Sequence, residues 1–429
     1  MKEFILKNKY DIFLIGLSIL TYMSYVGLLG QLLMPIFIVI AITAVFLRLD
    51  IFYLIPLGVF MQMSNGGLRD DVKTTTIYII MFTIILAFDA FYNRKINKLG
   101  KLFFPLLGLV VASIITGINA PTAYIWFAGL IQLVAVLAIY FYFVNTTQNP
   151  KEDLMLKAAK MFLYASVIIT LEMIFVISQH DLAPLEVISR RKIDLGWENI
   201  NVVIFTNLMA IPLITNIVLK SKYKAYYLVL AIIAGTGILL TLSRSSVLTL
   251  IVFLSFMVPY MFYKSKKRVN LLLQGIGALL VLGIFVIVLE QNGTISGYFD
   301  ALFGRELLAF DDRYKLLVIA WDTFKSNWLI GSGGIYASRH YLLEDGAKNY
   351  HNIIAQVSTL GVVGFAALSW LFIEKVKLIF SKKNTWKRVV LVLVFVTAFV
   401  NGWVQPMYFY ITYLIYLVMI LAVYENSES

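Results

Sequence analysis

Long apolar stretches alternate with short polar links along almost the whole chain. Most of the stretches approach or exceed the ~20 residues that an α-helix needs to cross ~30 Å of hydrocarbon. The pattern predicts spans over residues 12–29, 32–47, 51–63, 75–92, 102–118, 122–145, 161–179, 201–219, 225–242, 246–263, 271–289, 351–373, 389–403 and 407–424. Stretch 51–63 is short, and 389–424 can be read as one broken unit. The predicted fold is therefore all-α, a polytopic membrane protein with 12–14 transmembrane helices in one domain over residues 1–429.

The link over residues 290–350 is the long one among these spans. Loops of this length inside a compact fold usually have a function. Within it, two aspartates at 311 and 312 precede an apolar-periodic run, and acidic residues favour the positive end of a helix. The apolar side chains of the run recur at spacings of three and four: Leu317, Ala320, Trp321 and Phe324. We expect an amphipathic helix that lies on the membrane surface or caps a cavity.

Composition agrees with a membrane protein and excludes two other classes. The chain of 429 residues is 60% hydrophobic and only 14% charged, whereas charged residues make up about 25% of a soluble globular protein. A disordered chain would need low hydrophobicity. There is no cysteine, so the sequence holds no disulfide framework, no thiol nucleophile and no thiolate metal site.

The formal net charge of +12 indicates how the chain crosses the membrane. If the N-terminus is cytoplasmic and the spans alternate, the cytoplasmic links hold 24 of the 36 Lys and Arg residues, including the clusters at 94–98 and 264–268. Cytoplasmic links carry such an excess in most membrane proteins. We therefore predict a multi-pass plasma membrane protein with both termini cytoplasmic and residues 290–350 outside. Because orientation accounts for the charge, no nucleic acid partner is expected.

All three histidines fall on the outer side in this orientation. Histidine exchanges a proton near neutral pH, which makes it a natural general base. For His180 and His340 the plainer interpretation is an interfacial polar residue, since neither lies in a motif, whereas His351 does. Three histidines without cysteine do not favour a zinc site, and we predict no metal and no cofactor.

Arginines predicted on the outer side are unexpected, because Lys and Arg are usually enriched in the cytoplasmic links. A guanidinium offers five donors in a fork that matches phosphate oxygens, so one interpretation is a clamp for the diphosphate of a lipid-linked substrate. The plainer interpretation is pairing with outer acids. Arg244 favours the clamp, because it lies between two predicted spans, where a charge needs a partner. The outer arginines considered are Arg190, Arg191, Arg244, Arg305 and Arg313.

Glu172 lies inside the predicted span 161–179. An ionisable residue in a span is a functional candidate by default, because burying its charge in hydrocarbon is costly. Structural pairing, for instance with an arginine from the outer side, is the plainer interpretation of this carboxylate.

Short motifs cluster around the long link. Before it stands Thr241-Leu-Ser-Arg244, between two predicted spans. Within it, Arg313 is followed by Trp321 and then by Trp328-Leu-Ile-Gly-Ser-Gly333. After it, His351-Asn352 is followed by Gly361-Val-Val-Gly364.

Together these motifs resemble the O-antigen polymerase and ligase superfamily, which includes Wzy, WaaL and related capsule, exopolysaccharide and teichuronic acid polymerases. They are similar to its Thr-x-Ser-Arg pattern, its Arg, Trp and Gly-x-Gly string, and its His-Asn pattern followed by Gly-x-x-Gly. A weaker match is Leu195-Gly-Trp-Glu-Asn-Ile-Asn201. The resemblance covers roughly residues 195–365.

The resemblance implies a GT-C-like fold and glycosyl transfer on the outer face of the membrane. The donor would be an oligosaccharide on undecaprenyl diphosphate, so neither a nucleotide sugar nor a metal is needed. Arg244 and Arg313 would hold the diphosphate, and His351 would orient or deprotonate the acceptor hydroxyl. Further substrate contacts would come from Arg305, Arg190, Arg191, Asn201, Asn352 and Glu172. Implied partners are membrane lipid, a flippase and a chain-length regulator.

Several functions remain open on these grounds. A Lys-rich chain with many Ile, Asn and Tyr residues is typical of a Gram-positive cell, which has no lipid A acceptor, so a polysaccharide polymerase is favoured over a ligase. A lipid-linked oligosaccharide flippase would be expected to show internal repeats, and none is visible. A polyprenyl-phosphate-sugar glycosyltransferase would use an acidic pair in an early outer loop, where Asp70 and Asp71 lie.

Overall fold

The structure is a computed structural model, and it is helical wherever it has regular structure. It describes residues 8–29, 33–49, 51–63, 72–93, 96–120, 122–146, 153–189, 193, 195, 200–221, 224–265, 268–270, 272–273, 275–277, 297–298, 300, 302, 309–333, 357, 359–381, 385–404 and 411–426. No strand occurs among these residues. The predicted all-α class is confirmed.

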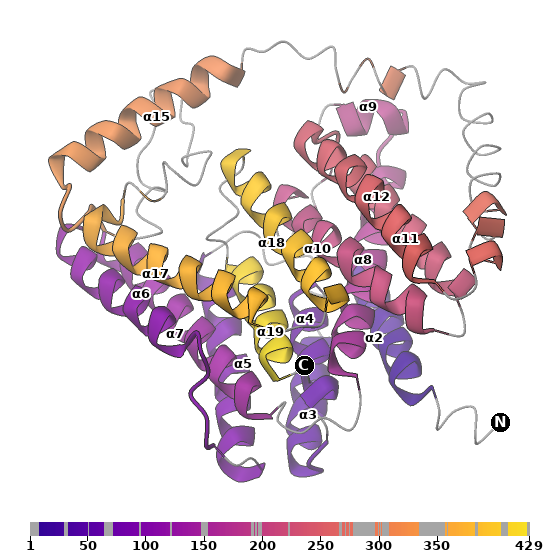
Figure 1. Cartoon of the computed structure of the whole chain (residues 1–429), viewed down its shortest axis with the longest axis horizontal. Helices are drawn as coiled ribbons and strands as arrows, with labels where there is room; N and C mark the ends of the chain where they lie inside the picture. Colours follow the sequence, from indigo (N-terminus) through magenta and orange to yellow (C-terminus); the bar gives the residue numbers. More distant parts are fainter. Residues whose placement is uncertain are drawn as a thin grey trace. The chain divides into compact units, whose positions relative to one another are not determined.

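The chain divides into two compact units. Their helices are labelled in Figure 1. Unit 1 comprises Met1–Val39, Phe52–Arg69 and Leu156–Glu306. Its helices are α2 (Lys9–Tyr25), α4 (Ile51–Met63), α8 (Leu154–Ser178), α9 (Pro184–Ser189), α10 (Ile200–Lys220), α11 (Lys224–Leu239) and α12 (Arg244–Lys264), and α3 (Leu33–Phe46) begins in it.

Unit 2 comprises Ile40–Ile51, Asp70–Met155 and Leu307–Ser429. Its helices are α5 (Val72–Asn93), α6 (Phe103–Thr116), the short 3-10 helix η2 (Gly117–Asn119), α7 (Ala123–Thr146), α15 (Ala309–Ser326), α17 (Gly361–Phe380), α18 (Thr385–Val404) and α19 (Ile411–Asn426). Each unit thus draws on segments that are far apart in the sequence.

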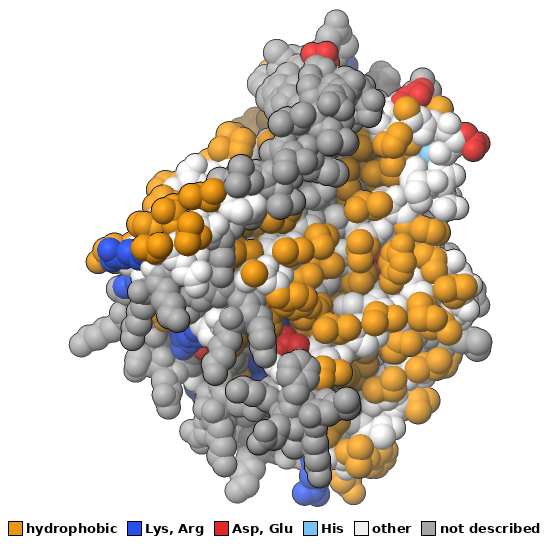
Figure 2. Space-filling model, turned by 90° about the vertical axis from the view of Figure 1, so that its right-hand side faces the viewer, with side chains coloured by type: hydrophobic (Ala, Val, Ile, Leu, Met, Phe, Trp, Pro, Cys, Tyr) orange, Lys and Arg blue, Asp and Glu red, His pale blue; other side chains and the backbone are white. Residues whose placement is uncertain are grey.

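Within the described residues, three helices are long and apolar enough to cross a membrane: Trp126–Thr146, Leu154–Ser178 and Ser246–Lys264. Shorter apolar helices are Pro35–Phe46, Ile80–Asn93, Phe103–Asn119, Ala225–Leu239 and Leu414–Asn426. Figure 2 shows hydrophobic side chains covering much of one face of the molecule, with only scattered charged ones. Such a surface requires a lipid environment, and the chain is a polytopic membrane protein.

Close helix packing and a polar cluster on α2, α8 and α11 stabilise the described part of unit 1. Gly237 lets α11 pack closely against α8 and α10. A Cβ at this position would overlap the Thr170 side chain of α8 and would lie 2.7 Å from Asn207 Nδ2 of α10. The polar cluster joins three helices through hydrogen bonds. Asp11 on α2 accepts a hydrogen bond from Lys160 Nζ on α8 at 2.6 Å and one from the Tyr227 hydroxyl on α11 at 2.9 Å. Burial of these groups is tolerated because each has a partner.

Unit 2 contains a comparable polar hub. The buried carboxylate of Glu425 on α19 accepts a hydrogen bond from the Tyr140 hydroxyl on α7 at 2.6 Å and one from the Lys101 amide at 3.1 Å. The Tyr140 oxygen in turn accepts the Leu102 amide at 2.9 Å, directly before α6. These bonds fix the relative positions of α6, α7 and α19. They satisfy polar groups that would otherwise be costly to bury.

Most boundaries of the described helices lie within four residues of the predicted ones, and α8, which begins at Leu154 rather than at 161, and α17 differ more. The predicted stretch 51–63 is helix α4, and the predicted amphipathic helix of the long link is α15. The stretch predicted from residue 351 contains α17, but that helix begins at Gly361, after a turn at Thr359 and Leu360. The reason for this later start is a contact with the segment after α15, described below.

Candidate active site

Arg244 is the first residue of α12, at the junction with α11. Ser243 precedes it in an extended conformation, with φ −84° and ψ 105°, which starts the helix. The first backbone N–H groups of a helix have no acceptor within the helix, so this end attracts anions. The Arg244 side chain is exposed, and its Nε donates a hydrogen bond to the Leu302 carbonyl at 2.6 Å. This contact restrains the guanidinium.

The turn before Arg244 is tightly organised. Leu242 has φ 47°, in the left-handed region that non-glycine residues rarely adopt, and its side chain is almost fully buried. The Thr241 hydroxyl donates to the Ile238 carbonyl at 2.7 Å, and the Ser246 hydroxyl donates to Ser243 Oγ at 3.0 Å. A strained backbone that the surroundings hold in place is common at functional sites.

Described residues of the long link, among them 298 and 302, pack against this turn. The Tyr298 hydroxyl donates to the Leu239 carbonyl at 2.7 Å. Burial raises the pKa of this hydroxyl to about 12, so it remains a donor at neutral pH. Gly297 lies directly against the Leu185 side chain of α9. Residues 297, 298 and 302 of the link therefore contact α9, α11 and α12 of unit 1.

In unit 2, two glycine-containing segments meet, and we call their contact the glycine junction (residues 327–332 and 359–363). The amides of Val362 and Val363 donate to the carbonyls of Trp328 and Leu329, at 2.8 Å and 3.2 Å. The Ser332 amide donates to the Thr359 carbonyl at 2.9 Å. Carbonyls from the end of the α15 segment thus satisfy the first N–H groups of α17.

Glycine is required at both centres of this junction. Gly331 has φ 87°, and a Cβ there would lie 2.5 Å from the carbonyl carbon of Leu360 and from the oxygen of Thr359. Gly361 has φ 61°, and a Cβ there would overlap the nitrogen of Gly331. The Gly331 carbonyl also accepts a hydrogen bond from Asn119 Nδ2 at 2.9 Å. The two glycine motifs seen in the sequence are therefore in direct backbone contact.

Of the remaining predicted site residues, the structure describes the side chain of one, only the backbone of two, and nothing of the others. Glu172 on α8 is completely buried. Arg313 lies in α15 and Asn201 in α10, but their side chains are outside the described set. Five predicted site residues are outside the described residues altogether: His351, Asn352, Arg305, Arg190 and Arg191. The proposed joint action of Arg244, Arg313 and His351 stays a prediction.

A second carboxylate, Asp89, lies within the predicted span 75–92, and the structure shows its partners. It is fully buried on α5, where its Oδ1 accepts Asn93 Nδ2 at 2.7 Å and its Oδ2 accepts the Tyr142 hydroxyl. These partners join α5 to α7 within unit 2.

The described residues contain no cluster of acidic and histidine side chains suited to a metal ion.

Residues 229–369 match the O-antigen ligase family (Wzy_C). This third of the chain is therefore similar to an O-antigen ligase domain. This confirms the resemblance to the O-antigen polymerase and ligase superfamily that the motifs indicated. The match includes Arg244, Arg313, the glycine junction and His351. None of the curated proteins compared with the chain matches it.

The similarity to the O-antigen ligase family indicates, in general terms, a glycosyltransferase-like enzyme that acts on lipid-linked glycans. Two features of the candidate site were not predicted from the sequence. The Leu302 carbonyl that holds Arg244 is a backbone group, which leaves no signature in a sequence. The contact between Gly331 and Gly361 does have a signal, since glycines in short motifs often mark close backbone approach.

Proposed function

We propose that this protein is a polysaccharide polymerase that joins undecaprenyl-diphosphate-linked repeat units on the outer face of the membrane. The observation that carries the proposal is Arg244, whose exposed guanidinium stands at the positive end of α12 within the residues that match the O-antigen ligase family. A fixed cation and a helix N-terminus at one point suit a diphosphate leaving group.

The proposed reaction is a single displacement between two lipid-linked glycans. The oxygen of an acceptor sugar hydroxyl bonds to the anomeric carbon of the donor, and the bond from that carbon to the phosphate oxygen breaks. The proton of the hydroxyl passes to His351, and undecaprenyl diphosphate leaves with the electron pair. Arg244, together with Arg313, stabilises the negative charge that develops on the leaving diphosphate. No metal or nucleotide is required, because the diphosphate is already an activated leaving group.

Deleting the gene and sizing the lipid-linked glycans tests this function. For a polymerase, single repeat units accumulate on the outer face, and the substitution His351→Ala produces the same accumulation with normal amounts of inserted protein. Finished chains left unattached would indicate a ligase instead. Units trapped on the cytoplasmic face would indicate a flippase.

A ligase is the second candidate, because the family that matches residues 229–369 is described by that activity. The two reactions share the donor and the diphosphate chemistry and differ in the acceptor. A reconstituted assay separates them. Protein supplied only with lipid-linked repeat units makes longer lipid-linked chains if it is a polymerase, and makes no product without a second acceptor if it is a ligase.

The proposed orientation can be tested with single cysteines, because the natural chain has none and gives no background labelling. Ser326 is exposed on α15, and Asn270 is exposed beyond the far end of α12. We expect Ser326→Cys to react with a membrane-impermeant maleimide in intact cells, and Asn270→Cys to react only after permeabilisation. The opposite pattern would reverse the orientation and contradict an outer catalytic face.

A further inference from the structure

The end of α12 opposite Arg244 carries a basic hollow that the proposed glycosyl transfer does not use. α12 has 21 residues, which at 1.5 Å per residue corresponds to about 30 Å, the thickness of a bilayer core. Lys264 therefore reaches the membrane surface opposite that of Arg244. Helical residues 268–270, 272–273 and 275–277 follow it in the chain.

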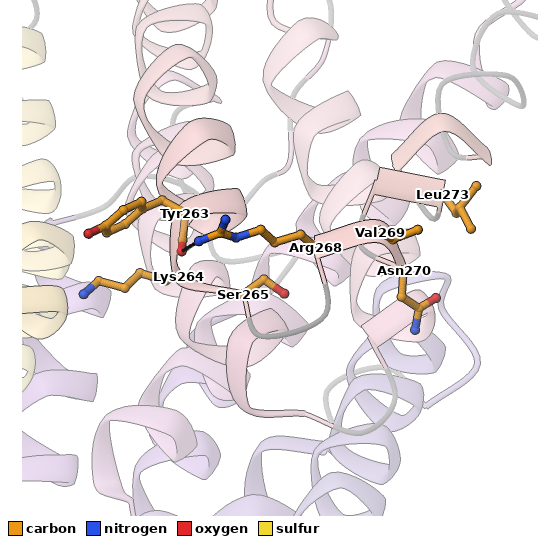
Figure 3. Close-up of a pocket in the computed structure, with 7 residues that line it drawn as sticks. All are labelled: Tyr263, Lys264, Ser265, Arg268, Val269, Asn270 and Leu273. Atoms are coloured by element: carbon orange, nitrogen blue, oxygen red, sulfur yellow. Dashed lines mark hydrogen bonds between the residues drawn. The ribbon is translucent and has the colours of Figure 1, made fainter.

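The hollow has a volume of about 780 Å³. It is lined by Tyr263, Lys264, Ser265, Arg268, Val269, Asn270 and Leu273, none of which is acidic (Figure 3). The Arg268 side chain extends back toward the end of α12, where its Nη2 donates to the Tyr263 carbonyl at 3.3 Å. Lys264 Nζ lies 5.5 Å from the centre of the Tyr263 ring. The two cations therefore belong to one side of the hollow, next to the last turn of the helix.

Apolar side chains surround these cations and face away from the protein. Tyr263 and Val269 are each 69% exposed, and Leu273 is 61% exposed. Only 28% of the span Ser246–Lys264 is buried inside the molecule, so most of α12 contacts its surroundings directly. Exposed apolar surface that leads into a cationic hollow is the pattern expected where acyl chains and a charged headgroup are bound together.

We propose that this hollow binds an anionic phospholipid, with the phosphate at Lys264 and Arg268 and the acyl chains along α12 and the helical residues after it. Basic groups next to a membrane-spanning helix attract anionic lipids, which are abundant in the cytoplasmic leaflet. A free phosphate ion would use the cations but would leave the apolar surface unused. The proposal concerns the opposite end of α12 from Arg244 and does not depend on the proposed reaction; it shares with the proposed function only the orientation that puts this end on the cytoplasmic side.

Native mass spectrometry of the full-length protein, in neutral detergent with an equal mixture of phosphatidylglycerol and phosphatidylcholine, tests the proposal. We expect phosphatidylglycerol to be retained preferentially. The substitutions Lys264→Gln and Arg268→Gln should each weaken its retention about fivefold, and the double substitution about 25-fold, because each cation contributes separately. Leu273→Gln should also weaken retention, since it removes apolar contact.

Lys377→Gln is the matched control, because it removes one charge from an exposed lysine of α17 on the same predicted side of the membrane. It should leave phosphatidylglycerol retention unchanged. Inorganic phosphate in millimolar excess should not displace the lipid. The proposal is overturned if the double substitution retains phosphatidylglycerol like the natural protein, if Lys377→Gln weakens it equally, or if inorganic phosphate displaces it.

Discussion

Replacing Arg244 by alanine is expected to lower the rate of glycan transfer at least about 100-fold, with the protein still inserted and folded. Removing one preorganised group that stabilises a developing negative charge typically costs about 10²–10³ in rate. The side chain is exposed and is held by a hydrogen bond to a backbone carbonyl, that of Leu302, so little packing is lost. The measurement is the initial rate of polymer formation per amount of inserted protein, with lipid-linked repeat units as substrate.

Two further variants show what the guanidinium contributes. Arg244→Lys retains a positive charge but loses both the planar fork and the Nε donor that bonds to Leu302. It should therefore retain more activity than Arg244→Ala but fall about tenfold below the natural protein. Lys325→Ala is the control: it removes an exposed cation of α15, predicted on the same side of the membrane, whose ion pair with Asp322 is solvent-exposed and weak. Its rate should stay within about twofold of normal.

Full activity of Arg244→Ala would remove this residue from the proposed mechanism. Equal losses in Arg244→Ala and Lys325→Ala would attribute the effect to the general charge of the outer surface rather than to one anchored guanidinium. Restoration of full activity by lysine would show that charge alone is needed and that the bond to the Leu302 carbonyl has no catalytic consequence.

Local periodicity is sufficient to predict most helices of this fold. α4, α10 and α15 each follow from a run of apolar residues with polar residues at its ends, which is information that lies within the helix itself. The start of α17 is not predictable in this way. The sequence before Gly361 mixes apolar residues with Gln356, Ser358 and Thr359 and gives no clear helix start. The first N–H groups of α17 are instead satisfied by the carbonyls of Trp328 and Leu329, more than thirty residues earlier.

The candidate site is predictable to a similar extent. Arg244 can be selected from the sequence, because an arginine between two spans is costly unless it is used. The hydrogen bond that anchors Arg244 cannot be predicted from the sequence. Leu302 contributes only its backbone carbonyl to this bond, and its side chain is buried. Likewise, the sequence shows the glycines of the junction as two separate motifs. Their contact depends on the three-dimensional path of the chain between residues 331 and 361.

The substitution Gly331→Ala is expected to destabilise unit 2 by at least about 3 kcal/mol. A left-handed φ costs a non-glycine residue roughly 1–2 kcal/mol, and Gly331 has φ 87°. In addition, the new Cβ would lie 2.5 Å from backbone atoms of Leu360 and Thr359, which cannot move without shifting the start of α17. The measurement is the temperature at which the detergent-solubilised protein loses its monodisperse elution peak, which should fall by several degrees.

Two other glycines separate the causes of this loss. Gly27 has φ 85°, but a Cβ added there would meet no atom within 4 Å, so Gly27→Ala should show the conformational cost alone, roughly 1–2 kcal/mol. Gly235 lies within α11, also with open space around it, so Gly235→Ala should be neutral or stabilising by up to about 1 kcal/mol. If Gly331→Ala resembles Gly27→Ala, the backbone contact of the junction contributes nothing.

The reciprocal substitution makes the test of the junction specific. Gly361→Ala should destabilise the protein as much as Gly331→Ala, because each Cβ would overlap the backbone of the opposite segment. Since either change separates the same two segments, the double substitution should cost clearly less than the two single effects added together. Simple additivity would mean that the two glycines act independently, and the hydrogen bonds from Val362 and Val363 to the α15 segment would then survive either change.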